Sequence, residues 1–212
     1  MPADHIIVHD TRLEGQVFRH PELHVIETHC EPIAQIAARI RGATTVSASM
    51  NMSQTTVPVP VLSIFAHGAD ITSGPVDWAM QLGLEYVHLN NAYQFGRSIR
   101  GCVSDRIRVM CCNGSRTDDA QATCRALAAG AGAHVYAATT NQDYGMPETM
   151  RTFGGYVISP AHPRGGWINF GQWEGSVYVF PPDGGPGRLS FEGPAPAVRP
   201  GGNGPSQGDI CN

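Results

Sequence analysis

Short apolar segments separated by helix-forming segments are the feature that most constrains the fold of this chain. Runs typical of buried or half-buried strands occur at residues 5–9, 23–27, 57–66, 106–111 and 133–138. Isoleucines at helical spacing between residues 33 and 40 predict a helix after the second run. Thr117, as an N-cap, predicts another helix over 117–130. This alternation predicts an α/β sandwich with a mainly parallel sheet and helices covering both faces.

The remaining segments have weaker patterns. We expect a helical turn at 77–82, a short strand at 84–89 and a helix at 91–100. Beyond residue 140, two segments rich in Trp and Tyr, 166–170 and 176–180, are typical of a hairpin. The predicted organisation is one domain over residues 1–165, a small C-terminal β-hairpin extension over 166–190 and a flexible Gly/Pro-rich tail over 191–212.

Charge and composition argue against nucleic acid and membranes as binding partners of this chain. A formal charge of -4 and the lack of a basic patch make nucleic acid an improbable partner. No apolar stretch is long enough to cross a bilayer, and residues 1–20 do not have the pattern of a secretory signal. We therefore expect no membrane partner. The expected location is the cytoplasm, or a target cell reached by a route without a signal peptide.

All 14 basic residues are arginine. One interpretation is codon bias in a GC-rich genome, which the many Ala, Gly and Pro residues also favour. The other is that a protein delivered into a foreign cell benefits from having no lysine to ubiquitinate. The second interpretation leads to the hypothesis of a delivered bacterial effector or toxin.

Cysteine and histidine spacing gives no indication of a metal centre. The six cysteines include no pair of C-x-x-C knuckles, and the chain is too large to need disulfide bonds for stability, so we expect reduced thiols. His20, His24, His29 and Cys30 form the densest group of potential ligands, but no closing pair follows at zinc-finger spacing. We predict neither a metal nor a cofactor.

Two reactive side chains follow the ends of predicted core strands. His67 follows the run at 57–66, and Cys112 follows the run at 106–111. Reactive groups in an open parallel sheet gather at the carboxyl ends of the strands. A helix N-terminus and a nearby histidine both favour the thiolate, which is the nucleophilic form of cysteine. Either residue alone is more often structural, but the combination predicts a catalytic pair.

The two motifs resemble those of the caspase-like cysteine peptidases, a superfamily that includes caspases, metacaspases, clostripain, separase and the self-cleaving domains of bacterial toxins. VPVLSIFAHG is similar to the segment in which His-Gly ends the third strand of that fold. IRVMCCNGS is similar to the segment in which the nucleophile ends the fourth strand, with Met110 to Gly114 lying over the pattern Q-A-C-x-G. This alignment selects Cys112 rather than Cys111. The resemblance covers about residues 5–140.

The resemblance implies a role for each matched residue. His67 would accept and donate the proton, Cys112 would be the nucleophile, and the backbone N–H groups of Gly68 and Cys112 would form the oxyanion hole. Relatives that cleave after basic residues carry Asp where this chain has Met110. Met110 therefore favours an apolar or small side chain at P1, although Asp70, Asp77, Asp143 or Glu148 on neighbouring loops would supply a charge.

The loop after the last core strand supplies further candidate substrate-binding residues, because this loop usually borders the cleft in the caspase-like fold. The candidates are Thr139, Asn141, Asp143 and Tyr144. The expected function is peptide-bond hydrolysis, with self-cleavage as one form of it and a polypeptide as substrate. Two alternatives stay open: a different thiol acyl-transfer enzyme on the same fold, and a non-enzymatic interaction module.

Overall fold

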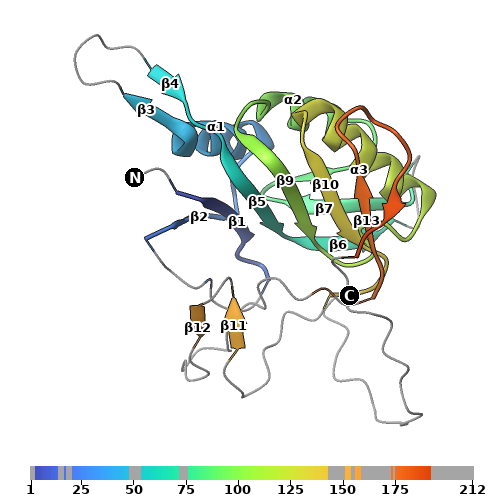
Figure 1. Ribbon diagram of the computed structural model, residues 1–212. Helices are drawn as coiled ribbons and strands as arrows, with labels where there is room; N and C mark the ends of the chain where they lie inside the picture. The colour runs from blue at the N-terminus through green and yellow to red at the C-terminus, as the bar shows by residue number, and fades with distance from the viewer. Residues whose placement is uncertain are drawn as a thin grey trace.

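A seven-stranded sheet is the centre of the protein in the computed structural model (Figure 1). The structure describes residues 3–13, 17, 21–47, 54–71, 76–142, 151–153, 156–158, 173 and 175–191. In spatial order the strands are β14 (Arg188–Leu189), β13 (Val177–Phe180), β10 (His134–Ala138), β9 (Val103–Met110), β5 (Val59–Phe65), β1 (His5–Asp10) and β2 (Leu23–Thr28). The five strands from β10 to β2 are parallel, while β13 and β14 are antiparallel to their neighbours. The predicted α/β class with a mainly parallel sheet is confirmed.

Within the described residues, three helices and three small sheets accompany the central sheet. The helices are α1 (Ile33–Thr44), α2 (Ala92–Ser98) and α3 (Asp118–Ala131). One small sheet joins β6 (His67–Asp70), β7 (Trp78–Leu82) and β8 (Glu85–Val87). The others are the pairs β3 (Thr45–Ser47) with β4 (Gln54–Thr56), and β11 (Arg151–Phe153) with β12 (Tyr156–Ile158). In Figure 1 the β3–β4 pair projects away from the body of the molecule.

The main core lies between one face of the sheet and the helices. The apolar face of α1 buries Ile36 and Ile40 completely, and α3 buries Leu127. These side chains belong to one apolar cluster with the inward-facing residues of β1, β5, β9 and β10. All three helices contribute to this cluster, so among the described residues they occupy a single face of the sheet. The helical layer predicted for the other face is not found in the described part of the chain.

Helices α2 and α3 cross in direct backbone contact. A methyl group added at Gly130 would lie 2.8 Å from the backbone nitrogen of Arg97 and 3.1 Å from the α-carbon of Gly96. Two glycines thus meet at the crossing point, where a larger residue would separate the helices. The guanidinium of Arg100 donates to the carbonyl oxygens of Gly130 and Ala129, which lie in the last turn of α3.

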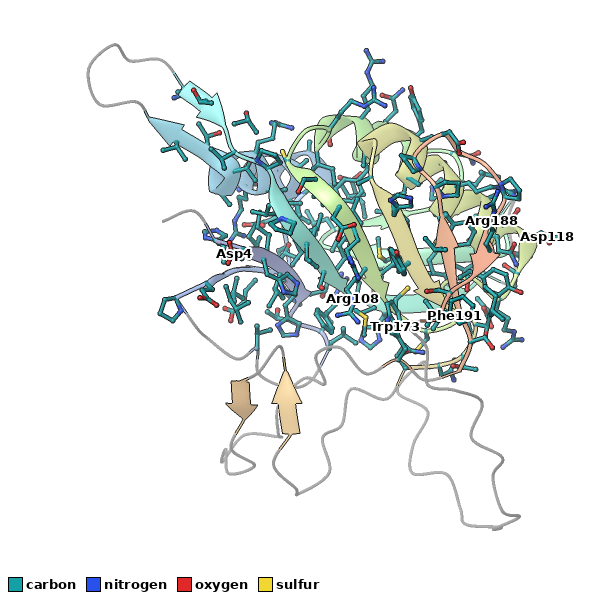
Figure 2. The ribbon with its side chains drawn as sticks, in the orientation of Figure 1. Asp4, Arg108, Asp118, Trp173, Arg188 and Phe191 are labelled. Carbon is teal, nitrogen blue, oxygen red and sulfur yellow. The ribbon has the colours of Figure 1, made fainter. Side chains whose placement is uncertain are left out.

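The second face of the sheet combines an apolar cluster with buried polar groups. Phe65, Met110 and Ala138 pack there with Trp173. Arg108 lies 5.2 Å from the centre of the Trp173 ring, and Figure 2 shows these two side chains together near the end of β9. Further toward the beginning of the strands, a ring nitrogen of His5 lies 2.8 Å from the hydroxyl of Ser63, and both residues are buried.

Several predicted elements differ in the structure. Where a helical turn was predicted at 77–82, the structure has the strand β7, Trp78–Leu82. The predicted strand at 176–180 exists as β13, but it pairs with β10 and β14 as part of the main sheet. Its expected partner at 166–170 lies outside the described residues, as does the tail after residue 191. In the described part of the chain, no helix has the length and apolar character needed to span a membrane.

Candidate active site

Strands β5 and β9 end side by side at the carboxyl edge of the sheet. Phe65 is paired with Met110, and the backbone nitrogen of Ala66 donates to the carbonyl oxygen of Met110 at 3.4 Å. His67 and Cys112 each lie two residues beyond that pair. The parallel register therefore carries the two candidate catalytic residues to the same edge of the sheet, as expected for groups that follow neighbouring parallel strands.

Gly68 lies in contact with the peptide groups of Cys112. A methyl group at Gly68 would overlap the carbonyl oxygen of Cys112 and would lie 2.9 Å from its carbonyl carbon and 3.0 Å from its nitrogen. No residue larger than glycine fits there without moving one of the two segments. Because His67 directly precedes Gly68, this contact also places the backbone of the histidine beside the cysteine.

The loop that carries Cys112 is fixed by hydrogen bonds on both sides. Asn113 has φ of 54°, in the left-handed region that asparagine tolerates better than most residues. Its backbone nitrogen donates to the carbonyl oxygen of Thr140 at 3.1 Å. The backbone nitrogen of Ser115 donates to Ala138, and the Cys124 thiol lies 3.2 Å from the carbonyl oxygen of Gly114. These contacts define the direction in which the chain leaves β9.

Two thiols next to the Cys112 loop, those of Cys111 and Cys124, are completely buried. Complete burial raises the pKa of the Cys111 thiol well above its ordinary value, and the neighbouring Cys124 adds to this effect. Burial likewise raises the pKa of Cys124 to about 12. Both therefore stay protonated at neutral pH and are poor nucleophiles. The raised pKa values argue against Cys111 and Cys124 as nucleophiles, while Cys112, which is also buried at 2% exposed, is selected by the motif alignment.

Cys112 forms a disulfide bond in this structure, whereas Cys30, Cys102, Cys111 and Cys124 are free. The cysteine spacing predicts reduced thiols, and Cys112 differs from that prediction. Cys211, the sixth cysteine of the chain, lies outside the described residues. A sulfur atom in a disulfide is not a thiolate, so any nucleophilic chemistry at Cys112 requires reduction first.

Helix α3, which follows Cys112, would stabilise a thiolate there less than its position alone suggests. Helix α3 begins at Asp118, and its first turn carries the carboxylates of Asp118 and Asp119. These negative charges oppose the favourable effect of the helix dipole on a thiolate. Removal of the thiol proton would consequently depend mainly on a base such as His67.

A small polar network joins the start of α3 to the hairpin that carries His67. The Thr117 hydroxyl donates to the Asp77 carboxylate at 2.8 Å and accepts from the backbone nitrogen of Ala120 at 3.1 Å. The Asp119 carboxylate accepts from the backbone nitrogen of Asp77 at 2.8 Å. Since Asp77 immediately precedes β7, the network fixes the β6–β7 hairpin against α3.

The structure brings part of the predicted substrate-binding set to the same edge. Asn113 contacts Thr140, so the segment containing Thr139 and Asn141 borders the Cys112 loop. The Thr139 hydroxyl donates to the carbonyl oxygen of Ser176 at 3.3 Å, which ties this segment to the start of β13.

The other predicted substrate-binding residues differ in exposure, and two of them lie outside the described part of the chain. Asp70 is exposed at the end of β6, three residues after His67. Met110 is only 1% exposed and packs inside the second apolar cluster. Asp143 and Tyr144 lie outside the described residues.

Trp78 belongs to this site and was missed by the sequence analysis. Its indole Nε1 donates to the carbonyl oxygen of Cys112 at 3.1 Å. The prediction of a helical turn at 77–82 concealed this role. A better signal was the Ser73-Gly74-Pro75 turn sequence between two short segments, which is typical of a hairpin that returns toward His67.

Comparisons with protein-family models, with curated proteins and with solved structures found no match for this chain. Within the part of the chain that the structure describes, no three His, Cys, Asp or Glu side chains are grouped so as to hold a metal ion. The chemistry of the site must therefore be argued from its own residues.

Proposed function

We propose that this protein is a cysteine peptidase that hydrolyses peptide bonds through His67 and Cys112. The contact between Gly68 and the Cys112 peptide carries the proposal, because it brings the His-Gly motif against the cysteine from a distant part of the sequence. The buried, protonated Cys111 further supports Cys112 as the nucleophile.

The reaction follows the usual course of thiol acyl transfer. His67 takes the proton from Cys112, and the sulfur forms a bond to the substrate carbonyl carbon. The backbone N–H groups of Gly68 and Cys112 donate to the resulting oxyanion. His67 then gives the proton to the leaving amine as the C–N bond breaks, which leaves a thioester. Water, deprotonated by His67, attacks the thioester, and the C–S bond breaks to release a carboxylate and the thiol.

The proposal includes a caspase-like arrangement of the domain over residues 1–165. In chain order, β5 and β9 are the third and fourth strands of the central sheet, which is where the resemblance expects the histidine and cysteine motifs. The three-layer sandwich, with helices also on the second face, is part of this proposal.

The proposed substrate is a polypeptide, with an apolar or small residue preceding the cleaved bond. This preference rests on the motif alignment, in which Met110 stands where relatives that cleave after basic residues carry Asp, because the Met110 side chain is itself buried in the second apolar cluster. The proposal includes cleavage of the chain by itself. It also includes a place of action, which is either a target cell into which the protein is delivered as an effector, or the cytoplasm. A non-peptidase thiol acyl-transfer reaction would use the same dyad, and a purely binding module would need neither residue.

Cleavage of a diverse peptide library, read by mass spectrometry, tests this function. The protein is first reduced, because Cys112 is in a disulfide bond. We expect the reduced wild type to cleave and Cys112→Ala to be inactive. Cys111→Ala is the matched control, since it removes the neighbouring buried thiol, and it should retain cleavage. Equal behaviour of wild type and Cys112→Ala would overturn the proposal.

Alkylation of the reduced protein by iodoacetamide across pH provides a test that needs no substrate. A thiol activated by His67 reacts below the pH at which a free thiol of pKa about 8.5 does. The His67→Ala variant should shift the reaction of Cys112 to higher pH. Preferential labelling of Cys111 would contradict the assignment of the nucleophile.

A further inference from the structure

Trp78 links the small sheet to the peptide of the candidate nucleophile. Its side chain is 1% exposed, and its Nε1 donates to the carbonyl oxygen of Cys112 at 3.1 Å, across 34 residues of sequence. The distance is that of an ordinary N–H···O hydrogen bond, and such a bond is electrostatically stronger in the protein interior than in water. The tryptophan therefore fixes a polar group of the nucleophile in addition to filling the helix-side core.

The peptide between Cys112 and Asn113 is fixed at both ends. Its carbonyl oxygen accepts from Trp78, and its N–H, on Asn113, donates to the carbonyl oxygen of Thr140 at 3.1 Å. Because a peptide group is planar, any rotation of this plane would weaken both bonds. Rotation would also change the Cys112 backbone, which determines where Sγ and the Cys112 N–H lie relative to Gly68.

The donor and the proposed base belong to the same hairpin. Strands β6 and β7 pair His67 with Gln81, Gly68 with Met80 and Asp70 with Trp78. One strand thus supplies the proposed base and the glycine that contacts Cys112, and the other supplies the indole that binds the Cys112 carbonyl. The hairpin is held in turn by the bonds between Asp77 and the start of α3.

We propose that Trp78 is a positioning residue for the reaction, holding the Cys112–Asn113 peptide so that the thiol stays aligned with His67. This inference rests on the proposed function. Trp78 acts on the rate of the chemical step through the geometry of Cys112. Substrate binding depends on other residues, so the effect should fall on kcat and leave KM nearly unchanged.

The Trp78→Phe variant tests the proposal, because it keeps an aromatic ring and removes the N–H. In reduced protein we expect kcat to fall about five- to tenfold, as for the loss of one neutral hydrogen bond. We also expect the pH midpoint of Cys112 alkylation to rise toward that of a free thiol. Trp173→Phe is the matched control: that indole is 3% exposed, and its Nε1 has no hydrogen-bond partner within the described residues. It should keep the alkylation profile of the wild type.

A second pair of variants acts on the other end of the same peptide. Asn113→Ala disfavours the positive φ at this position, whereas Asn113→Gly accepts it. The alanine variant should shift the alkylation profile in the same direction as Trp78→Phe, and the glycine variant should stay closer to the wild type. These variants keep the inference testable if Trp78→Phe does not fold.

The outcomes separate the two proposals. If Trp78→Phe lowers the melting temperature but leaves both kcat and the alkylation profile unchanged, Trp78 is only a core residue and the inference fails. If the wild type cleaves no peptide, the proposed function fails, while the alkylation profiles still decide whether Trp78 positions the thiol.

Discussion

Gly68 is the residue on which the geometry of the site depends most directly. The Gly68→Ala variant would place a methyl group against the Cys112 carbonyl oxygen, so one of the two segments would have to move. We expect a loss of stability of about 1–3 kcal/mol, as for overpacking in a rigid site, together with loss of cleavage. Urea unfolding and the peptide assay measure the two effects. A variant as stable and active as the wild type would show that the contact is unimportant.

His5 makes the stability of the protein sensitive to acid. Burial, and secondarily the positive charge of Arg108, lowers the pKa of His5 from 6.5 to about 4. The unfolded chain therefore binds a proton at this residue between these values while the folded protein does not. Stability from His5 is complete above pH about 6.5 and is lost as the pH falls toward 4, by about 3 kcal/mol in all.

The His5→Gln variant should reduce this acid sensitivity, because glutamine does not titrate in this range and still reaches the Ser63 hydroxyl. Urea unfolding at several pH values between 4 and 7 measures the slope. Some slope should remain, since burial also lowers the pKa of His9. An unchanged slope in His5→Gln would contradict the assignment to His5.

At the scale of single residues, the placement of the His67-Gly68 and Cys112 motifs at one edge of the sheet could be predicted, because each motif follows a recognisable apolar strand. The role of Trp78 could not, because a hydrogen bond to a distant carbonyl oxygen has no local pattern. The fate of the Cys112 sulfur was likewise invisible, since sequence spacing alone does not determine which cysteines are oxidised.

Among the elements, the crossing of α2 and α3 depends on two glycines. Gly130→Ala would place a methyl group 2.8 Å from the backbone nitrogen of Arg97 and force the helices apart. We expect a loss of about 1–3 kcal/mol in the free energy of unfolding, despite the higher helix propensity of alanine.

Gly42→Ala is the control for that substitution, because it makes the same change in α1 where no atom lies within 4 Å of the new methyl group. It should stabilise the protein by about 0.5–1 kcal/mol. Thermal or urea unfolding compares the two variants. A loss of similar size in both would mean that the crossing tolerates alanine.

Elements with strong local signals were predicted well. The helix at 117–130 was predicted from a capping threonine, and the structure has α3 at Asp118–Ala131 with Thr117 as N-cap. Residues 77–82 had neither a clear period nor a cap, and tertiary pairing with β6 made them a strand. The crossing of α2 with α3 was not predictable either, because it depends on residues far apart in the sequence.

At the scale of the whole molecule, the central sheet, as far as the structure describes it, has two edges that differ from each other, and both are poorly suited to pairing with another strand. One edge is β14, which has only two residues and carries Arg188. The other is β2, where His24 and Glu27 are exposed. Short edge strands and charged side chains discourage pairing with another copy. We therefore expect a monomer near 22.7 kDa in reducing buffer.

Light scattering coupled to size-exclusion chromatography, over a wide range of protein concentrations, tests this expectation. Reductant excludes a bridge through the exposed thiol of Cys30. A mass that rises toward twice the monomer value with concentration would show that one of the edges pairs after all.

The overall class was predictable because alternation of strands and helices has few packing solutions. The addition of β13 and β14 to the sheet was not, because antiparallel strands near the end of a chain can join either a local hairpin or the main sheet. The face of the sheet on which a helix packs was not predictable either. It depends on how the crossover connections link the strands, and local sequence does not specify this.

The described cysteines comprise one exposed thiol, three buried thiols and the disulfide-bonded Cys112. The number of reactive thiols in the folded protein therefore reports whether the Cys112 disulfide is closed or reduced. Among the five cysteines that the structure describes, only Cys30 should react with a colorimetric thiol reagent while the protein is folded and unreduced. Reduction should release two further thiols, that of Cys112 and that of its disulfide partner, whereas unfolding without reductant should expose the three buried thiols and leave the disulfide closed. The stoichiometry of a simple titration would thus report how much of a preparation is chemically competent.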